Sequence, residues 1–175
     1  MPYYIYARAV APQIDTKLVR EWLSRCRAEH CKCYETGFIA PTALENIRLI
    51  DVHKRQVVER DIGTKYIALS YVWGFHTKGL LTLSTVKKYA REGSLTQEDV
   101  PRTIRDAMLL VADLGERYLW VDSLCIIQDD LLDKRRYLPM MGEIYDAAVV
   151  VIVAAVKTHT VDYRGEEATK ENSPE

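Results

Sequence analysis

The sequence lacks both of the usual glycine-rich phosphate-binding motifs, because its eight glycines occur neither as G-x-G-x-x-G nor as G-x-x-x-x-G-K-[ST]. A nucleotide site would therefore need another device. The sequence also lacks an apolar run long enough to cross a bilayer, since the longest covers only residues 147–156. Its first residues show no charged segment followed by a long apolar run, so no signal peptide is expected. These absences predict a cytoplasmic protein without a membrane span.

An excess of charge of either sign is also absent, because 24 Lys and Arg oppose 25 Asp and Glu. Proteins that bind nucleic acid or anionic membranes through their overall charge are strongly basic, so neither is expected as a partner. The chain has only four cysteines, which in a reducing compartment would be thiols or metal ligands rather than disulfides. With 48% hydrophobic residues, a chain of 175 residues can bury the core of one domain.

Residues 1–46 are predicted to form a helical lead-in to that domain. Asp15 or Thr16 can cap a helix that ends near His30 and carries Trp22 and other apolar residues on one side. A connector containing Gly and Pro follows. The sequences IRLIDV and QVVE then flank HKR, which predicts a β-hairpin of Ile47–Val52 and Gln56–Glu59.

The end of the first helix carries a possible metal cluster. Cys26 and His30 are one helical turn apart, and Cys31 and Cys33 lie just beyond them. These four residues could bind zinc. Zinc sites usually use two separate C-x₂₋₄-C or similar pairs, so the irregular spacing here favours reduced structural thiols over a zinc-binding module.

Residues 47–156 are predicted to form an α/β core with a parallel sheet and flanking helices. Three buried strands are expected at Tyr66–Tyr71, Tyr118–Asp122 and Val149–Val153. A helix capped by Thr96 or Asp99, with Pro101 in its first turn and Gly115 at its end, joins the first two strands. A second helix over Asp133–Ala147, delayed by Pro139, leads to the third. The order βαβαβ predicts parallel strands.

Two further segments complete this prediction. Residues 75–99 show no firm periodicity apart from a possible short helix at Ser84–Arg91, and they are expected to form a long surface excursion over the end of the first strand. Residues 157–175 are polar and have no apolar face, so disorder is predicted for them.

Side chains that can bind a ligand gather where the first two predicted strands end. Open α/β sheets place ligands at the carboxyl ends of parallel strands. Tyr71 and Trp73 could stack on a base or nicotinamide ring, while Asp122 and Ser123 could bond ribose hydroxyls. Alternatively, Trp73 packs under the excursion and Asp122 braces its own loop. The candidate ligand-binding residues are Ser70, Tyr71, Trp73, Gly74, Asp122, Ser123, Cys125, Gln128 and Asp129.

Two side chains near these strand ends also suggest a different chemistry. Cys125 and His76 could act as nucleophile and base. However, Cys125 lies between apolar neighbours, where thiols are usually buried and inert, so the inert reading is favoured. The acidic residues Asp129, Asp130 and Asp133 are expected to start the following helix, where its dipole favours negative charge.

Three stretches, YIALSYVWG, VPRTIRDAMLLVADLGERYLWVDSLCIIQDD and MGEIYDAAVVVIVAA, resemble the successive motifs of the fungal heterokaryon-incompatibility domain. The resemblance covers Arg48 to Ala155, and EWLSRCRAEHCKC resembles a pattern that often precedes that domain. It implies a signalling domain that promotes regulated cell death when genetically different hyphae fuse, by self-association or contact with a protein partner. It also implies a flavodoxin-like fold, distantly related to Toll/interleukin-receptor domains.

That kinship implies NAD as a possible substrate, because some Toll/interleukin-receptor domains cleave it. Tyr71, Trp73 and the loop Ser123–Asp130 would then line the nicotinamide-ribose pocket. The family usually carries a Trp-Thr-x-Gln-Glu motif after the third strand, and this sequence has none. Glu166 and Glu167 lie instead in the polar tail, where a disordered carboxylate would not be oriented for catalysis. The resemblance thus implies a chain truncated at its C-terminus and inactive as an NAD-cleaving enzyme.

Overall fold

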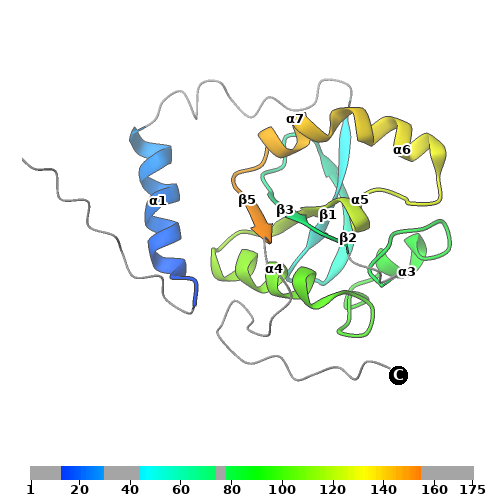
Figure 1. Cartoon of the computed structure of the whole chain (residues 1–175), viewed down its shortest axis with the longest axis horizontal. Helices are drawn as coiled ribbons and strands as arrows, with labels where there is room; N and C mark the ends of the chain where they lie inside the picture. Colours follow the sequence, from blue (N-terminus) through cyan, green and yellow to red (C-terminus); the bar gives the residue numbers. More distant parts are fainter. Residues whose placement is uncertain (1–12, 30–43, 74–77, 155–175) are drawn as a thin grey trace, which may run out of the picture.

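A single mixed β-sheet organises the computed structural model, which describes residues 13–29, 44–73 and 78–154 (Figure 1). The strand order is β2-β1-β4-β3-β5. Helices α3 and α4 lie along one side of the sheet and α6 and α7 along the other (Figure 1). No helix within these ranges is long and apolar enough to cross a membrane. The strands are β1 Asn46–Asp51, β2 Gln56–Asp61, β3 Ile67–Tyr71, β4 Tyr118–Val121 and β5 Val151–Ala154.

The βαβαβ prediction is confirmed for one half of the sheet. Strand β3 pairs in parallel with both β4 and β5, so the three predicted strands do lie side by side. Helix α4, Arg102–Asp113, joins β3 to β4 and buries Ile104, Ala107 and Val111. It ends where predicted, because Gly115 adopts a φ of 79° and lets the chain turn back after the last helical turn.

The predicted parallel sheet is only part of the observed one, which is mixed because the hairpin expected as a lead-in joins it. The hairpin of β1 and β2 forms as expected, but β1 also pairs antiparallel with β4. Leu49 and Ile50 are both fully buried, so β1 has core on each face. At the same junction the Arg117 guanidinium donates to Asp51 Oδ2 at 2.8 and 3.0 Å. Local periodicity identifies a hairpin, but it does not say which other strand the hairpin joins.

The helix predicted over Asp133–Ala147 is broken into three pieces, α6 Leu131–Tyr137, a 3₁₀ turn at Leu138–Met140 and α7 Met141–Asp146. Pro139 lies in the 3₁₀ turn, since it lacks the N–H that an uninterrupted helix would use. Helix α6 starts before Asp133, because Asp130 Oδ1 accepts hydrogen bonds from the amides of Leu132 and Asp133 at 2.8 and 3.4 Å.

The excursion after β3 is more than a surface loop. Leu81, Tyr89 and Leu95 are buried, and the predicted short helix is present as α3, Val86–Tyr89. Neither Thr96 nor Asp99 caps α4, because the Asp99 carboxylate accepts instead from the Thr96 hydroxyl and pairs with Lys88. Scattered apolar residues without a period gave no sign that this segment completes the core.

Helix α1, Thr16–Glu29, begins as predicted, with Asp15 Oδ1 accepting from the amides of Lys17 and Leu18 at 3.1 Å. It makes only slight contact with the rest of the domain. Val19 packs against the core, and Arg27 bonds Glu116 at 2.9 Å, whereas none of its residues is fully buried. The predicted disordered tail at 157–175 lies outside the described residues.

Candidate functional site

The candidate residues that follow β3 and those that follow β4 do lie in contact. We call this contact the strand-end corner; it is formed by Tyr71, Trp73, Asp122 and Ser123. Leu69 of β3 pairs with Val121 of β4, so the residues that follow these two positions lie next to each other. The Tyr71 hydroxyl lies 3.1 Å from the Ser123 hydroxyl. The Trp73 indole N–H donates to both oxygens of Asp122, at 3.0 and 3.1 Å. The polar atoms predicted to bind a ligand thus bind one another.

The corner is built by an abrupt change from strand to helix. Strand β4 ends at Val121, and the next four residues form the single turn α5, Asp122–Cys125. The Asp122 carboxylate accepts from the amide of Ser123 at 2.7 Å, and its carbonyl accepts from the amide of Ile126 at 3.1 Å. Asp122 therefore braces its own loop, as the alternative interpretation predicted. Trp73 remains 37% exposed, and its predicted packing under the excursion stays a prediction because residues 74–77 lie outside the described residues.

The other candidate residues mainly hold the loop in place. Gln128 Nε2 donates to the carbonyls of Asp122 and Ile126 at 3.0 and 2.9 Å. Asp129 Oδ1 accepts from the amide of Leu83 at 2.8 Å, which ties the loop to the excursion. Ser70 is partly buried within β3. Gly74 and His76 lie outside the described residues, so their predicted roles stay predictions.

Burial sets the electrostatics of the corner. It raises the pKa of the Asp122 carboxyl, an effect that the hydrogen bonds from Trp73 and from the Ser123 amide only partly offset. It also raises the pKa of Tyr71, against the opposing hydrogen bond with Ser123. Asp122 forms no ion pair with the part of the chain that the structure describes. The corner therefore holds a partly desolvated carboxyl group whose pKa lies above its ordinary value.

The raised pKa of Asp122 predicts a pH dependence for Asp122→Asn. A carboxyl pKa above its ordinary value of 3.8 gives the folded state a contribution that is present at low pH and lost as pH rises through the folded pKa. Asparagine cannot ionise, so the stability of Asp122→Asn relative to wild type should increase from about pH 3 to about pH 7. Urea unfolding of both proteins across this range measures the difference in their free energies of unfolding. The contributions of the other carboxyl groups are the same in both proteins and cancel in this difference. A relative stability that falls with pH would contradict the prediction.

An ion pair that the sequence did not predict, between Arg48 and Asp133, lies behind the strand-end corner. Arg48, on β1, donates from Nη1 to the carbonyl of Cys125 and to Asp133 Oδ2, both at 2.8 Å. Asp133 Oδ2 also accepts from the amide of Ile127 at 2.7 Å. Asp133 thus does more than begin a helix. No sequence signal could have paired residues 85 positions apart on a hairpin and a helix.

Cys125 cannot contact a ligand in this arrangement. Its side chain is fully buried, and its sulfur accepts from the amide of Val121 at 3.4 Å. Burial raises the pKa of its thiol to about 12, which leaves almost no thiolate near neutral pH. This burial favours the inert interpretation of Cys125, and the ligand-binding and nucleophile roles considered for it stay predictions.

We expect native Cys125 to react with iodoacetamide at about pH 8 at least ~100-fold more slowly than an exposed thiol, because the reagent attacks thiolate. Peptide mapping by mass spectrometry after timed labelling measures the rate. The same labelling in concentrated urea is the control and should modify Cys125 fully. Rapid modification of the folded protein would show that this part of the core opens.

The predicted metal cluster is described only in part. Cys26 is partly exposed on α1, whereas His30, Cys31 and Cys33 lie outside the described residues. Within the described ranges no group of three or more His, Cys, Asp or Glu side chains is placed to hold a metal ion. Zinc binding by the four residues stays a prediction.

Comparison with known proteins identifies relatives of the chain. The family model described as "Heterokaryon incompatibility protein (HET)" matches residues 66–174, which include all four residues of the strand-end corner. The chain is also 27% identical over 125 residues to heterokaryon incompatibility protein 6, OR allele, of Neurospora crassa. That match covers 62% of this chain but only 18% of the relative, so the chain spans less than a fifth of the relative's length. No solved structure matches.

Proposed function

Because the chain belongs to the heterokaryon-incompatibility family, we propose that it acts in the cytoplasm as a signalling and interaction domain that promotes regulated cell death on non-self recognition. The observation that carries this proposal is the family match over residues 66–174. The match begins one residue before β3 and includes α4, β4, α5 and β5. It thus covers the parallel half of the sheet and the strand-end corner, which are the parts that give the domain its shape.

The strand-end corner supports an interaction role better than catalysis. The single indole N–H donor is already bonded to the Asp122 carboxylate, and the two hydroxyls are bonded to each other, so a substrate here would compete with internal hydrogen bonds. The parallel arrangement of β4, β3 and β5 is compatible with the kinship to Toll/interleukin-receptor domains that we propose, without implying their enzymatic activity.

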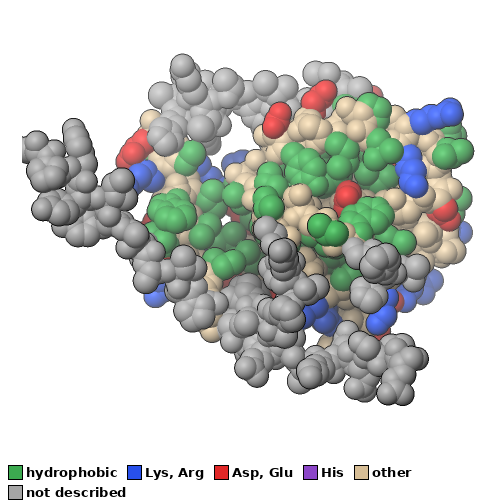
Figure 2. Space-filling model, in the orientation of Figure 1, with side chains coloured by type: hydrophobic (Ala, Val, Ile, Leu, Met, Phe, Trp, Pro, Cys, Tyr) green, Lys and Arg blue, Asp and Glu red, His purple; other side chains and the backbone are tan. Residues whose placement is uncertain are grey.

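The two edges of the sheet differ in a way that supports association. Edge strand β2 carries Glu59, Arg60 and Asp61, and charged residues protect an edge from pairing with other chains. Edge strand β5 has the sequence VIVA, without a charge, and Val153 is 67% exposed. Figure 2 shows apolar side chains gathered on the face that carries β5. An uncharged edge of this kind favours contact with a second copy or a protein partner.

Induced expression of the chain in a filamentous fungus tests the proposal. We expect slower colony growth and more cells stained by a vital dye than in a strain that expresses the variant Trp120→Ala, which removes a central core side chain. Native mass spectrometry of the purified protein tests self-association, and chromatography of NAD incubations tests for nicotinamide release. Unchanged growth with soluble, folded protein present would contradict the proposed role, and nicotinamide release would favour the enzymatic alternative.

A further inference from the structure

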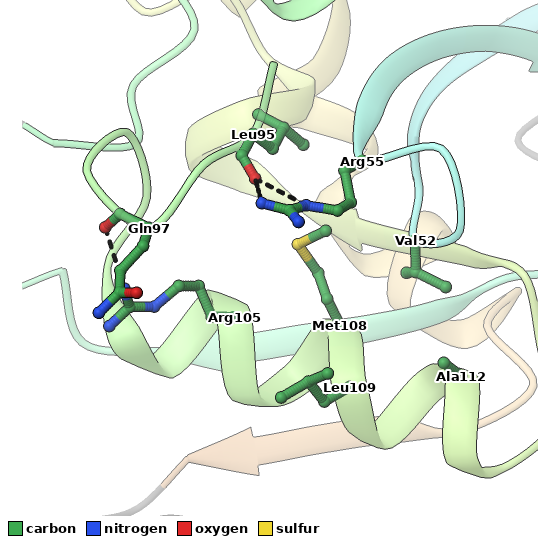
Figure 3. Close-up of a pocket in the computed structure, with 8 residues that line it drawn as sticks. All are labelled: Val52, Arg55, Leu95, Gln97, Arg105, Met108, Leu109 and Ala112. Atoms are coloured by element: carbon green, nitrogen blue, oxygen red, sulfur yellow. Dashed lines mark hydrogen bonds between the residues drawn. The ribbon is translucent and has the colours of Figure 1, made fainter. Parts of the chain in front are cut away.

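A hollow of about 250 Å³ lies between the β1–β2 turn, the loop before α4 and one side of α4 from Arg105 to Ala112 (Figure 3). It lies at the end of the sheet opposite the strand-end corner, because the β1–β2 turn adjoins the start of β4, where Asp51 pairs with Tyr118. The residues that matter for its chemistry are Val52, Arg55, Leu95, Arg105, Met108 and Leu109.

The floor and one wall of this hollow are apolar. Val52 and Met108 are both 7% exposed and lie at its base, while Leu109 is 43% exposed on its rim. Arg105, Leu109 and Ala112 recur at helical spacing, so one side of α4 faces the hollow while the other packs on the sheet. A large apolar group that entered here would cover Leu109 and contact the buried floor.

Two arginines are fixed beside this apolar surface (Figure 3). Arg55 donates from Nε and Nη2 to the carbonyl of Leu95 at 3.3 and 3.2 Å, and Arg105 donates from Nη1 to the carbonyl of Gln97 at 3.0 Å. Each guanidinium has five N–H donors, so donors remain for an anion. The carbonyls orient the guanidinium groups without neutralising their charge.

Neither arginine has an anionic partner among the residues that the structure describes. Neighbouring cationic side chains do have anionic partners. Lys54 pairs with Glu92 at 3.3 Å, and Arg102, one turn before Arg105, pairs with Asp106 at 3.5 Å. The hollow therefore combines an apolar floor with two oriented and uncompensated positive charges, which complement a group that is both apolar and acidic.

We propose that this hollow binds an acidic segment of a partner protein, which inserts one large apolar side chain between Arg55 and Arg105 and places carboxylates against both guanidiniums. The volume of about 250 Å³ lies below the roughly 300–1,000 Å³ of pockets for drug-sized ligands, which fits a single inserted side chain rather than a whole small molecule. Arginine binds carboxylates with paired hydrogen bonds, which would set the register of the segment. The inference rests on the proposed interaction role for its biological meaning, but its test uses purified protein and is independent of fungal growth.

The probe is the acetylated and amidated peptide Glu-Glu-Leu-Glu-Glu, titrated into isotope-labelled protein and followed by NMR. We expect saturable shifts of the amides of Leu95, Gln97 and residues 105–112, with an affinity that falls as salt is added. The peptides Glu-Glu-Ala-Glu-Glu and Lys-Lys-Leu-Lys-Lys should bind at least ~10-fold more weakly, because each lacks one of the two matching features.

Variants separate this site from general charge attraction. Arg105→Gln should weaken binding of the leucine peptide about 10-fold, whereas Arg102→Gln, on the same helix but outside the hollow, should change it less than about 2-fold. Leu109→Glu puts a carboxylate on the exposed rim and should abolish binding while leaving the thermal unfolding midpoint nearly unchanged. Growth results do not enter this comparison, so failure here leaves the proposed cell-death role standing.

Three outcomes would overturn the proposal. Shifts that map away from the hollow would place binding elsewhere. Equal loss in Arg105→Gln and Arg102→Gln would indicate unspecific attraction. Benzoate that binds the hollow as tightly as the leucine peptide would identify a small organic anion, rather than a protein segment, as its ligand.

Discussion

Replacement of Asp133 by alanine is expected to lower the free energy of unfolding by about 3–5 kcal/mol, because it leaves the Arg48 guanidinium buried without its counterion. The two side chains are only 15% and 8% exposed. Arg48 also bonds the carbonyl of Cys125 and lies 5.1 Å from the centre of the Tyr137 ring. Loss of the carboxylate also leaves the amide of Ile127 without its acceptor. Urea unfolding followed by circular dichroism measures the change.

A double variant tests whether the pair acts as a unit. Arg48→Met with Asp133→Leu removes both charges and keeps apolar volume, so it should be clearly more stable than Asp133→Ala. Glu29→Ala serves as a control, because it removes one partner of the exposed Arg25–Glu29 pair and should have a much smaller effect. Strictly additive effects of the substitutions at 48 and 133 would contradict the coupling.

Trp120→Ala is expected to lower the free energy of unfolding by a similar amount, about 3–5 kcal/mol. Trp120 is the largest fully buried side chain, and it lies on β4 between β1 and β3. Its ring meets that of Tyr145 edge to face, with centroids 5.3 Å apart and an interplanar angle of 81°. Alanine would leave a cavity that the surrounding strands cannot fill without moving. Denaturant unfolding of the variant measures the loss.

Trp120→Phe provides the matched control. The indole N–H of Trp120 has no acceptor within the described part of the chain, so phenylalanine removes an unsatisfied donor while it keeps most of the apolar volume. It should lose less than half as much stability as Trp120→Ala. If Trp120→Ala does not fold at all, Trp120→Phe remains measurable. A cost below about 1 kcal/mol for alanine would show that the sheet centre relaxes more easily than this packing implies.

Most secondary structure could be predicted from local pattern. The apolar run at β4, the helical spacing of Ile104, Ala107 and Val111, and the turn at Gly115 each act over a few residues, and each is confirmed. The exceptions also have local physical causes. Pro139 divides the helix predicted over Asp133–Ala147, and Asp130 moves its start, because one residue lacks a donor and the other supplies an acceptor.

The strand-end corner could be located from the sequence, but the hydrogen bonding of its polar atoms could not be predicted. Placement of Tyr71, Trp73, Asp122 and Ser123 at neighbouring strand ends follows from the parallel order of β3 and β4. Whether their polar atoms face a ligand or one another depends on side-chain geometry across the two strands, which distances of 3.0–3.1 Å now show to be internal pairing. Burial of Cys125, by contrast, was indicated by its apolar neighbours, although no periodic pattern predicted the turn α5 that places it.

The sequence by itself determined where the parallel strands and α4 form and which residues stand at the ends of β3 and β4, because these features depend on contacts between near neighbours. Only the tertiary structure decided that β1 lies against β4, that Arg48 pairs with Asp133, and that Arg55 and Arg105 flank one hollow. Each of these joins segments tens of residues apart. Such contacts form only when burial of a shared core offsets the entropic cost of closing a long loop. Local sequence patterns do not predict whether it does.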